Sequence, residues 1–143
     1  MSATVDVNLL VYASNEYDPV QAAARSFIDG LVAGPQLLYL FWPALMGYLR
    51  IVTSPAILPR PLTPAAATEN VTDLLAPPHV RAAGEGQLFW SLYRGGEGAA
   101  TRGNAVPDAH LVALMHEHGV NTIYTRDRGF RRFDGITVRD PLA

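Results

Sequence analysis

ATVDVNLLVYA, residues 3–13, is a short run of β-branched and aliphatic residues that two polar side chains interrupt. Such a run is typical of a buried strand in a parallel sheet that continues into a helix. The polar residues are Asp6 and Asn8, and a polar group in a buried strand is costly unless it has a partner. The stretch therefore predicts an α/β fold and marks two residues for which a function must be found.

Outward from this strand, segments with helical spacing alternate with short strand-like runs. Asp18 before Pro19 is typical of a helix N-cap, and Gly34 of a helix end. The predicted helices cover residues 20–34, 44–54, 65–76, 85–96 and 108–119, and the further strands cover residues 37–42, 79–83, 121–125 and 135–141. Loops are predicted at the proline-rich residues 55–64 and the glycine-rich residues 95–103. This alternation predicts a three-layer α/β/α sandwich around a central parallel sheet.

The composition suits one folded domain that spans residues 1–143. The chain is 49% hydrophobic and 17% charged, which supplies a core and is too little charge for a disordered polymer. The lack of cysteine excludes a disulfide scaffold, a thiolate metal site and a cysteine nucleophile. The first residues have neither a basic region nor a long apolar run, so we expect a cytoplasmic protein with no signal peptide and no membrane contact.

The charge pattern argues against a protein that coats nucleic acid. Such binding needs a cluster of cations, whereas the net charge here is -2. All eleven basic residues are arginine, and five of them lie in the last eighteen positions. Guanidinium groups suit phosphate contacts, but a GC-rich genome would explain the same bias. Local contact with nucleic acid therefore stays open.

Three aspartates fall where a parallel α/β sheet forms its ligand site. Asp6 lies in the first strand, Asp108 at a helix start and Asp127 just after a strand. The carboxyl ends of strands and the adjoining helix N-termini form the ligand crevice of such sheets. Converging carboxylates repel one another, and a hard divalent cation such as Mg²⁺ or Mn²⁺ offsets that repulsion. The ordinary structural interpretations are a strand-end turn residue, a helix cap and an Asx-turn residue, respectively.

Four segments, taken in order, carry a family resemblance. They are VDVNLL at residues 5–10, GNAVPDAHL at residues 103–111, EHG at residues 117–119, and TRDRGF at residues 125–130 followed by Arg132 and Phe133. Together they resemble PIN-domain ribonuclease toxins of the VapC type. LRIVTSP at residues 49–55 and the Pro141-Leu142 ending are similar to the mycobacterial branch of that family. The resemblance covers essentially the whole chain.

The resemblance implies a PIN-like α/β/α sandwich and a toxin of a type II toxin–antitoxin module. The implied activity is an Mg²⁺- or Mn²⁺-dependent endoribonuclease that hydrolyses a phosphodiester bond in a structured cellular RNA, a tRNA or an rRNA. The metal would lower the pKa of a bound water, and that water would attack the phosphodiester. A cognate VapB-like antitoxin would neutralise the toxin by placing its C-terminal segment in the active-site groove, and a homodimer is expected.

By motif match, the resemblance assigns catalysis and metal binding to Asp6, Asp108 and Asp127. Asn8 and Thr125 match the polar positions beside the first and the last of these acids. In those positions they would orient the carboxylates or bound water. The expected site therefore combines three acids with two polar supporting residues.

This chain departs from the family pattern at two places. Many relatives have a glutamate in the helix that corresponds to residues 44–50, which hold no acid here, and a carboxylate where this chain has Gly129. Three acids favour one metal, or a site completed by substrate phosphate, over a tightly held metal pair. A second hypothesis therefore stays open: a weakened or inactive PIN-fold module that binds RNA or antitoxin without turnover. A phosphoryl-transfer receiver domain normally needs a lysine, which this chain lacks.

Other polar residues have two interpretations each. Contact with RNA phosphate is one interpretation, and a solvated loop the other, for Arg102, Asn104, Arg126 and Arg128. His116 and His118 would suit a zinc ion only on a strand, because residues two apart on a helix point about 200° apart. The last turn of a helix is therefore the favoured interpretation for this pair.

Several apolar side chains are interpreted as packing residues. We expect Trp42 and Trp90 in the core or in an interface rather than as platforms for base stacking. Four more residues are apolar enough for a dimer or antitoxin surface, although core packing is favoured for them: Tyr12, Leu45, Tyr48 and Leu49.

Overall fold

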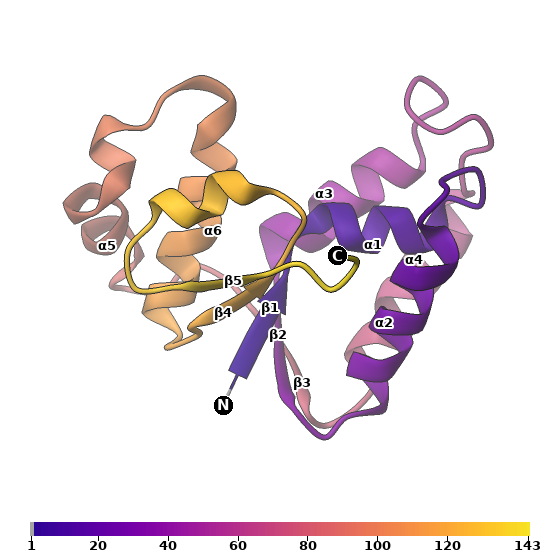
Figure 1. Ribbon diagram of the computed structural model, residues 1–143, viewed down its shortest axis with the longest axis horizontal. Helices are drawn as coiled ribbons and strands as arrows, with labels where there is room; N and C mark the ends of the chain where they lie inside the picture. The colour runs from indigo at the N-terminus through magenta and orange to yellow at the C-terminus, as the bar shows by residue number, and fades with distance from the viewer. Residues whose placement is uncertain (1) are drawn as a thin grey trace.

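Five parallel strands within residues 2–143, the part of the chain that the computed structural model describes, form one central sheet (Figure 1). They are β1 (Ser2–Val5), β2 (Leu37–Phe41), β3 (Val80–Ala83), β4 (Thr122–Tyr124) and β5 (Thr137–Arg139). Their order across the sheet is β3-β2-β1-β4-β5. Along the chain, β2 and β3 extend the sheet on one side of β1, and β4 and β5 then extend it on the other side. The direction therefore reverses between β1 and β4, and open α/β sheets bind ligands at such a reversal.

Helices cover the sheet on both faces. One face carries α1 (Val7–Ser14), α2 (Gln21–Ala33), α3 (Trp42–Val52) and α4 (Pro64–Leu75), and the opposite face carries α5 (Phe89–Gly95) and α6 (Val106–Glu117) (Figure 1). The predicted three-layer α/β/α sandwich is confirmed. Among the described residues, no helix has the length and apolar character that crossing a membrane requires.

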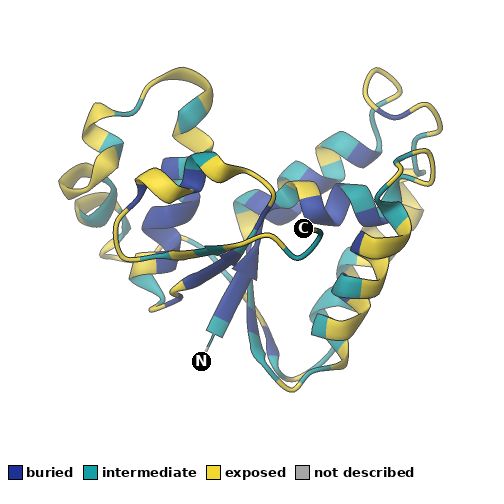
Figure 2. Ribbon diagram, viewed as in Figure 1, coloured by how far each residue is buried: buried dark blue, intermediate teal, exposed yellow. Residues whose placement is uncertain are grey.

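Successive side chains of each strand reach opposite layers. In β2, Leu38 and Leu40 pack in the cluster formed with α1 to α4, whereas Tyr39 and Phe41 pack in the cluster formed with α6. Figure 2 shows the central strands as the most deeply buried part of the fold. Because both faces are covered, the strands must be apolar on both sides. The nearly continuous apolar run at residues 37–42 satisfies this requirement.

The segment after β3 differs from its prediction. A helix was expected over residues 85–96, but α5 begins only at Phe89. The preceding residues are held as a loop, because Glu117 accepts hydrogen bonds from the backbone N–H groups of Gly86 at 2.8 Å and Leu88 at 3.0 Å. A tertiary contact between distant segments thus overrides the local helical pattern.

Short 3-10 helices occupy segments that were expected to be irregular. The glycine-rich loop contains η1 (Glu97–Ala100) and leads into η2 (Gly103–Ala105), and η3 (Arg128–Arg132) lies between β4 and β5. Gly103 has a φ of 62°, a left-handed conformation that glycine adopts readily. These short turns matter for function because η2 leads into α6 and η3 follows β4.

Candidate active site

Asp6 lies at the carboxyl end of the central strand. Val5 ends β1 and Val7 begins α1, so Asp6 is the single residue between the strand and the helix. Its backbone N–H donates to the carbonyl oxygen of Tyr124 at 3.0 Å, which ties it to the end of β4. Asp6 is only 7% exposed. The fold therefore places a buried acid at the reversal point between β1 and β4.

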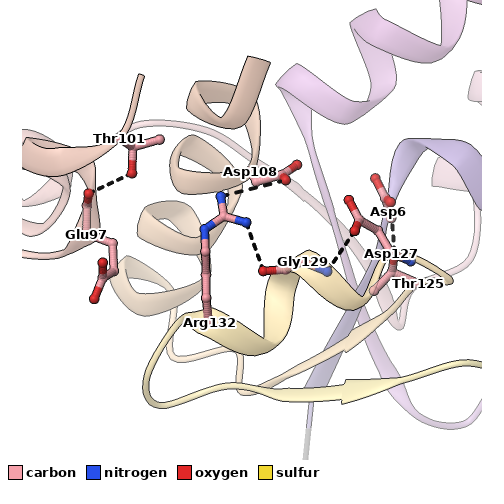
Figure 3. Close-up of polar contacts among 8 residues, drawn as sticks. All are labelled: Asp6, Glu97, Thr101, Asp108, Thr125, Asp127, Gly129 and Arg132. Atoms are coloured by element: carbon pink, nitrogen blue, oxygen red, sulfur yellow. Dashed lines mark hydrogen bonds and ion pairs between the residues drawn. The ribbon is translucent and has the colours of Figure 1, made fainter. Parts of the chain in front are cut away.

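Hydrogen bonds link Asp6 to the segment that follows β4 (Figure 3). The buried Thr125 hydroxyl donates to Asp6 Oδ2 at 2.8 Å and accepts from the backbone N–H of Asp127 at 2.9 Å. Asp127 Oδ1 in turn accepts from the backbone N–H of Gly129 at 2.8 Å and caps η3. The Asx-turn interpretation of Asp127 thus holds. It is compatible with a ligand role, because a carboxylate has two oxygens.

Asp108 reaches the same region from the first turn of α6. It is the third residue of that helix, and the N-cap position belongs to Ala105, so the helix-cap interpretation of Asp108 is wrong. Asp108 Oδ2 lies 3.9 Å from Arg132 Nη2, and its side chain is 26% exposed (Figure 3). Asp108 is therefore a partly buried acid in the first turn of α6 whose carboxylate lies beside Arg132 of η3.

Burial and neighbouring charges raise the pKa values of two of the carboxylates, Asp6 and Asp108. Burial raises the pKa of Asp108 to about 6, the charges of Asp127 and Asp6 act in the same direction, and Arg132 opposes them. Burial also raises the pKa of Asp6, although the hydrogen bond from Thr125 lowers it in part. The folded chain therefore holds these acids together at an energetic cost. Raised pKa values of this kind gather at functional sites.

A pocket of about 110 Å³ is lined by Asp6 and Asp108 together with Pro43, Pro107 and His110. Carboxylate oxygens are the ligands that Mg²⁺ and Mn²⁺ prefer. Within residues 2–143, however, no three His, Asp or Glu side chains gather closely enough to form a ready-made metal cage. The donor set therefore fits an ion held by one or two carboxylates and completed by water or substrate oxygens.

The two supporting residues predicted from the sequence take different places. Thr125 contacts Asp6 directly, as described above. Asn8 is exposed in the first turn of α1, and its side chain forms no hydrogen bond to any of the described residues. The structure thus brings Thr125 to the acids, whereas Asn8 faces solvent.

The four residues considered for RNA contact are all exposed. Arg102 and Asn104 lie at η2, the turn that leads into α6. Arg128 begins η3, and Arg126 Nε lies 4.0 Å from Asp140 Oδ2. Their exposure is compatible with either of the two interpretations, phosphate contact or a solvated loop.

Two side chains near the acids were not predicted as site residues. Arg132 Nη1 donates to the carbonyl oxygen of Gly129 at 2.8 Å, and its Nη2 faces Asp108. His110 Nε2 forms a hydrogen bond with Glu85. The concentration of arginines near the C-terminus was a signal for Arg132. No local pattern in the sequence indicates the contact between His110 and Glu85, because the two residues lie 25 positions apart.

His116 and His118 lie at the end of α6, and the two tryptophans lie outside the core. Helix α6 ends at Glu117 and His118 is its C-cap, so the helix-end interpretation of the pair is confirmed. Trp42 is 44% exposed and Trp90 64% exposed, so neither belongs to the core. Phe89 of α5 packs against the core instead, and the next residue of a helix necessarily points elsewhere.

The four apolar residues considered for core packing divide into two pairs. Leu45 and Tyr48 are 0% and 2% exposed, which confirms core packing for both. Tyr12 and Leu49 are partly buried and pack against the same cluster.

Thr125→Val is expected to lower the free energy of unfolding by about 1–3 kcal/mol, because it leaves a buried carboxylate and a backbone N–H without their partner. Thr125→Ser keeps the hydroxyl and serves as the matched control. Urea unfolding of both variants at neutral pH measures the difference. Equal stability of the two variants would show that the hydroxyl does not support Asp6.

Comparison with known proteins decides the family. The chain is 48% identical over 144 residues to Ribonuclease VapC48 of Mycobacterium tuberculosis, with 100% of this chain and 99% of the relative covered. The chain belongs to the VapC family of ribonucleases. The resemblance inferred from the four segments, including its mycobacterial character, is confirmed. No protein-family model matches the chain.

Solved structures support the same fold for this VapC-family chain. A structure of VapBC2 from Rickettsia felis bound to a DNA fragment from its promoter matches with a TM-score of 0.69 at 12% identity, covering 97% of this chain and 98% of that one. VapC20 of Mycobacterium tuberculosis, a toxin that cleaves the sarcin-ricin loop, matches with a TM-score of 0.67 at 18% identity, covering 96% and 99%. At these identities the likeness concerns the fold alone.

Proposed function

We propose that this VapC-family chain is a metal-dependent endoribonuclease toxin that hydrolyses a phosphodiester bond in a structured RNA. The relative that is 48% identical is named a ribonuclease, and this name supports the ribonuclease class. The observation that carries the proposal is the shared electrostatic environment of Asp6, Asp108 and Asp127, in which the pKa of Asp108 rises to about 6. Keeping ionised carboxylates this close together costs electrostatic free energy, and a site that binds a cation recovers that cost.

Mg²⁺ or Mn²⁺ is the proposed cofactor, and one or two carboxylates of the set Asp6, Asp108 and Asp127 would hold it, with water or substrate oxygens as the remaining ligands. When bound, such an ion lowers the pKa of a water and stabilises charge on a phosphate. The chain itself fixes the acids: Thr125 holds Asp6 Oδ2 in one orientation, and the η3 cap restrains Asp127. The partial burial of Asp108 limits the water that competes for its charge.

The proposed substrate is a tRNA or an rRNA with a defined fold. The description of VapC20 as a toxin that cleaves the sarcin-ricin loop supports this class of substrate. The net charge of -2 supports it as well, because a protein without a large basic surface cannot bind RNA by general electrostatic attraction. Recognition must then depend on local contacts and on the shape of the RNA.

We further propose a VapB-like antitoxin as the partner that neutralises the toxin, and a homodimer as the working assembly. The VapBC2 structure from Rickettsia felis supports an antitoxin partner. Large apolar side chains that remain exposed support a protein-binding surface: Trp42, Met46, Leu88 and Trp90. Light scattering of the purified chain, alone and with its antitoxin, measures the size of both assemblies.

Incubation of the purified protein with total cellular RNA tests the activity. With Mg²⁺ or Mn²⁺ we expect cuts at one or a few positions, and with EDTA we expect none, because the acids alone cannot activate water at neutral pH. Sequencing of the new 5′ ends identifies both the RNA and the position of the cut.

The absence of cuts with either metal would contradict the proposed activity. The weakened or inactive PIN-fold module would then be favoured, and the two missing acids, at residues 44–50 and at Gly129, would explain it. Cuts that persist in EDTA would instead contradict the metal requirement.

A further inference from the structure

Arg132 places a positive charge at the edge of the acidic site. It is the last residue of η3, and its guanidinium lies between Asp108 and the Gly129 turn (Figure 3). Nη1 donates to the Gly129 carbonyl oxygen at 2.8 Å, and Nη2 lies 3.9 Å from Asp108 Oδ2. The second distance is an ion pair but exceeds hydrogen-bond length. Most of the five guanidinium N–H donors are therefore not used by these two contacts.

The guanidinium is held in place and yet open to solvent. It lies 4.3 Å from the ring centroid of Phe133, which is buried in the core. Stacking of this kind restricts the side chain, so little entropy is lost when it binds an anion. The Arg132 side chain is nevertheless 40% exposed. It is thus oriented before a ligand arrives, and a ligand can reach it.

An RNA phosphate that enters this site comes close to three carboxylates. Asp6, Asp108 and Asp127 repel the phosphate, and a bound divalent cation would neutralise only part of the negative charge of these carboxylates. Arg132 is the basic residue that acts on Asp108 from within the site. By contrast, Arg126 is directed to Asp140. Arg132 is therefore the side chain best placed to receive a phosphate beside the acids.

We propose that Arg132 is a catalytic residue whose guanidinium donates hydrogen bonds to a non-bridging oxygen of the scissile phosphate, which it orients and whose developing charge it stabilises. This inference rests on the proposed ribonuclease activity. In that hydrolysis a water oxygen bonds to phosphorus as the ester bond breaks. One product keeps the phosphate, and the departing oxygen ends with a proton derived from the water. Arg132 keeps its own proton throughout and contributes charge and geometry.

The test compares Arg132→Ala and Arg132→Lys with a matched control, Arg131→Ala. Arg131 neighbours Arg132 on the same turn, is exposed, and pairs with no acid of residues 2–143. Single-turnover cleavage at saturating RNA is expected to fall about 100- to 1000-fold in Arg132→Ala, by an intermediate factor in Arg132→Lys, and less than about twofold in Arg131→Ala.

A phosphorothioate at the mapped cleavage site separates catalysis from support of the fold. Sulfur in place of the contacted oxygen should slow the parent enzyme, and this slowing should largely disappear in Arg132→Ala, which has already lost the contact. Thermal unfolding and Mn²⁺ binding of each variant are measured in parallel. A loss of cleavage that follows a loss of folding or of Mn²⁺ binding would overturn the inference.

The outcomes also separate this inference from the proposed activity. If the parent cuts RNA and Arg132→Ala cuts it at the rate of Arg131→Ala, only the role of Arg132 is wrong. An undiminished sulfur effect in Arg132→Ala would also overturn that role. If the parent cuts no RNA with either metal, the proposed activity itself fails, and the role of Arg132 fails with it.

Discussion

Asp6→Asn is expected to lower the rate of RNA cleavage at least about 1000-fold and to abolish the inhibition of growth by the toxin. The substitution removes one negative charge from the end of β1 and changes the size of the side chain very little. The amide oxygen of asparagine can still accept the hydrogen bond that Thr125 donates to Asp6 Oδ2. The fold should therefore survive, and the loss of activity would report the loss of charge.

Asp134→Asn is a suitable control for this experiment, because Asp134 is exposed and belongs to neither the acidic pocket nor its hydrogen bonds. We expect the control to cleave RNA as fast as the parent. Cleavage by both proteins is followed on the same RNA with Mn²⁺ and with EDTA. Full activity of Asp6→Asn would exclude this carboxylate from the chemistry and would contradict the acidic site as a whole.

Asp108→Asn is expected to stabilise the metal-free protein at neutral pH, although it should also inactivate it. The pKa of Asp108 is raised from 3.8 to about 6 in the folded chain. Below about pH 4 both the folded and the unfolded forms are protonated, and Asp108 imposes no penalty. As the pH rises from about 4 to about 6, the unfolded form loses its proton first, so stability is lost. Above pH 6 the folded form carries the full cost.

Asparagine cannot ionise and therefore removes this cost. The gain in the free energy of unfolding at pH 7 is expected to be about 1–3 kcal/mol, and it should shrink toward zero near pH 4. Urea unfolding of the parent and of Asp108→Asn in EDTA, over pH 4 to 7.5, measures this difference, and Asp134→Asn again serves as the control. A variant that is equally stable or less stable at pH 7 would contradict the raised pKa.

These two expectations describe one property of the site. The ionised forms of Asp6 and Asp108 are disfavoured in the folded chain, since burial and the charge of Asp127 act against their ionisation. Sites that perform chemistry often carry such a cost. Here the cost has a direct interpretation, because a bound cation would remove it.

The alternation of apolar runs predicted the architecture correctly. Parallel strands that are buried on both faces must be apolar throughout, and the helices between them must have one apolar side, so both patterns are visible along the chain. The same reasoning predicted that Asp6 and Asp127 lie near each other. Residues that end neighbouring parallel strands meet at one edge of the sheet, whatever their separation in sequence.

Other features depend on contacts that no local pattern encodes. The start of α5 is decided by Glu117, which binds a loop about 30 residues away. The orientation of Asp6 is decided by Thr125, at a separation of 119 residues. Arg132 belongs to a run of arginines that look equivalent along the chain, and only the packing of η3 directs this one toward Asp108.

The chain's own pattern of residues thus determined the layers of the fold, the order of its elements and the three acids at one edge of the sheet. The tertiary structure decided which polar groups support or oppose those acids, and therefore the raised pKa values of Asp6 and Asp108. The physical reason is that hydrophobic periodicity is a local property of the chain. Hydrogen bonding and desolvation depend on the neighbours that folding brings within a few ångströms.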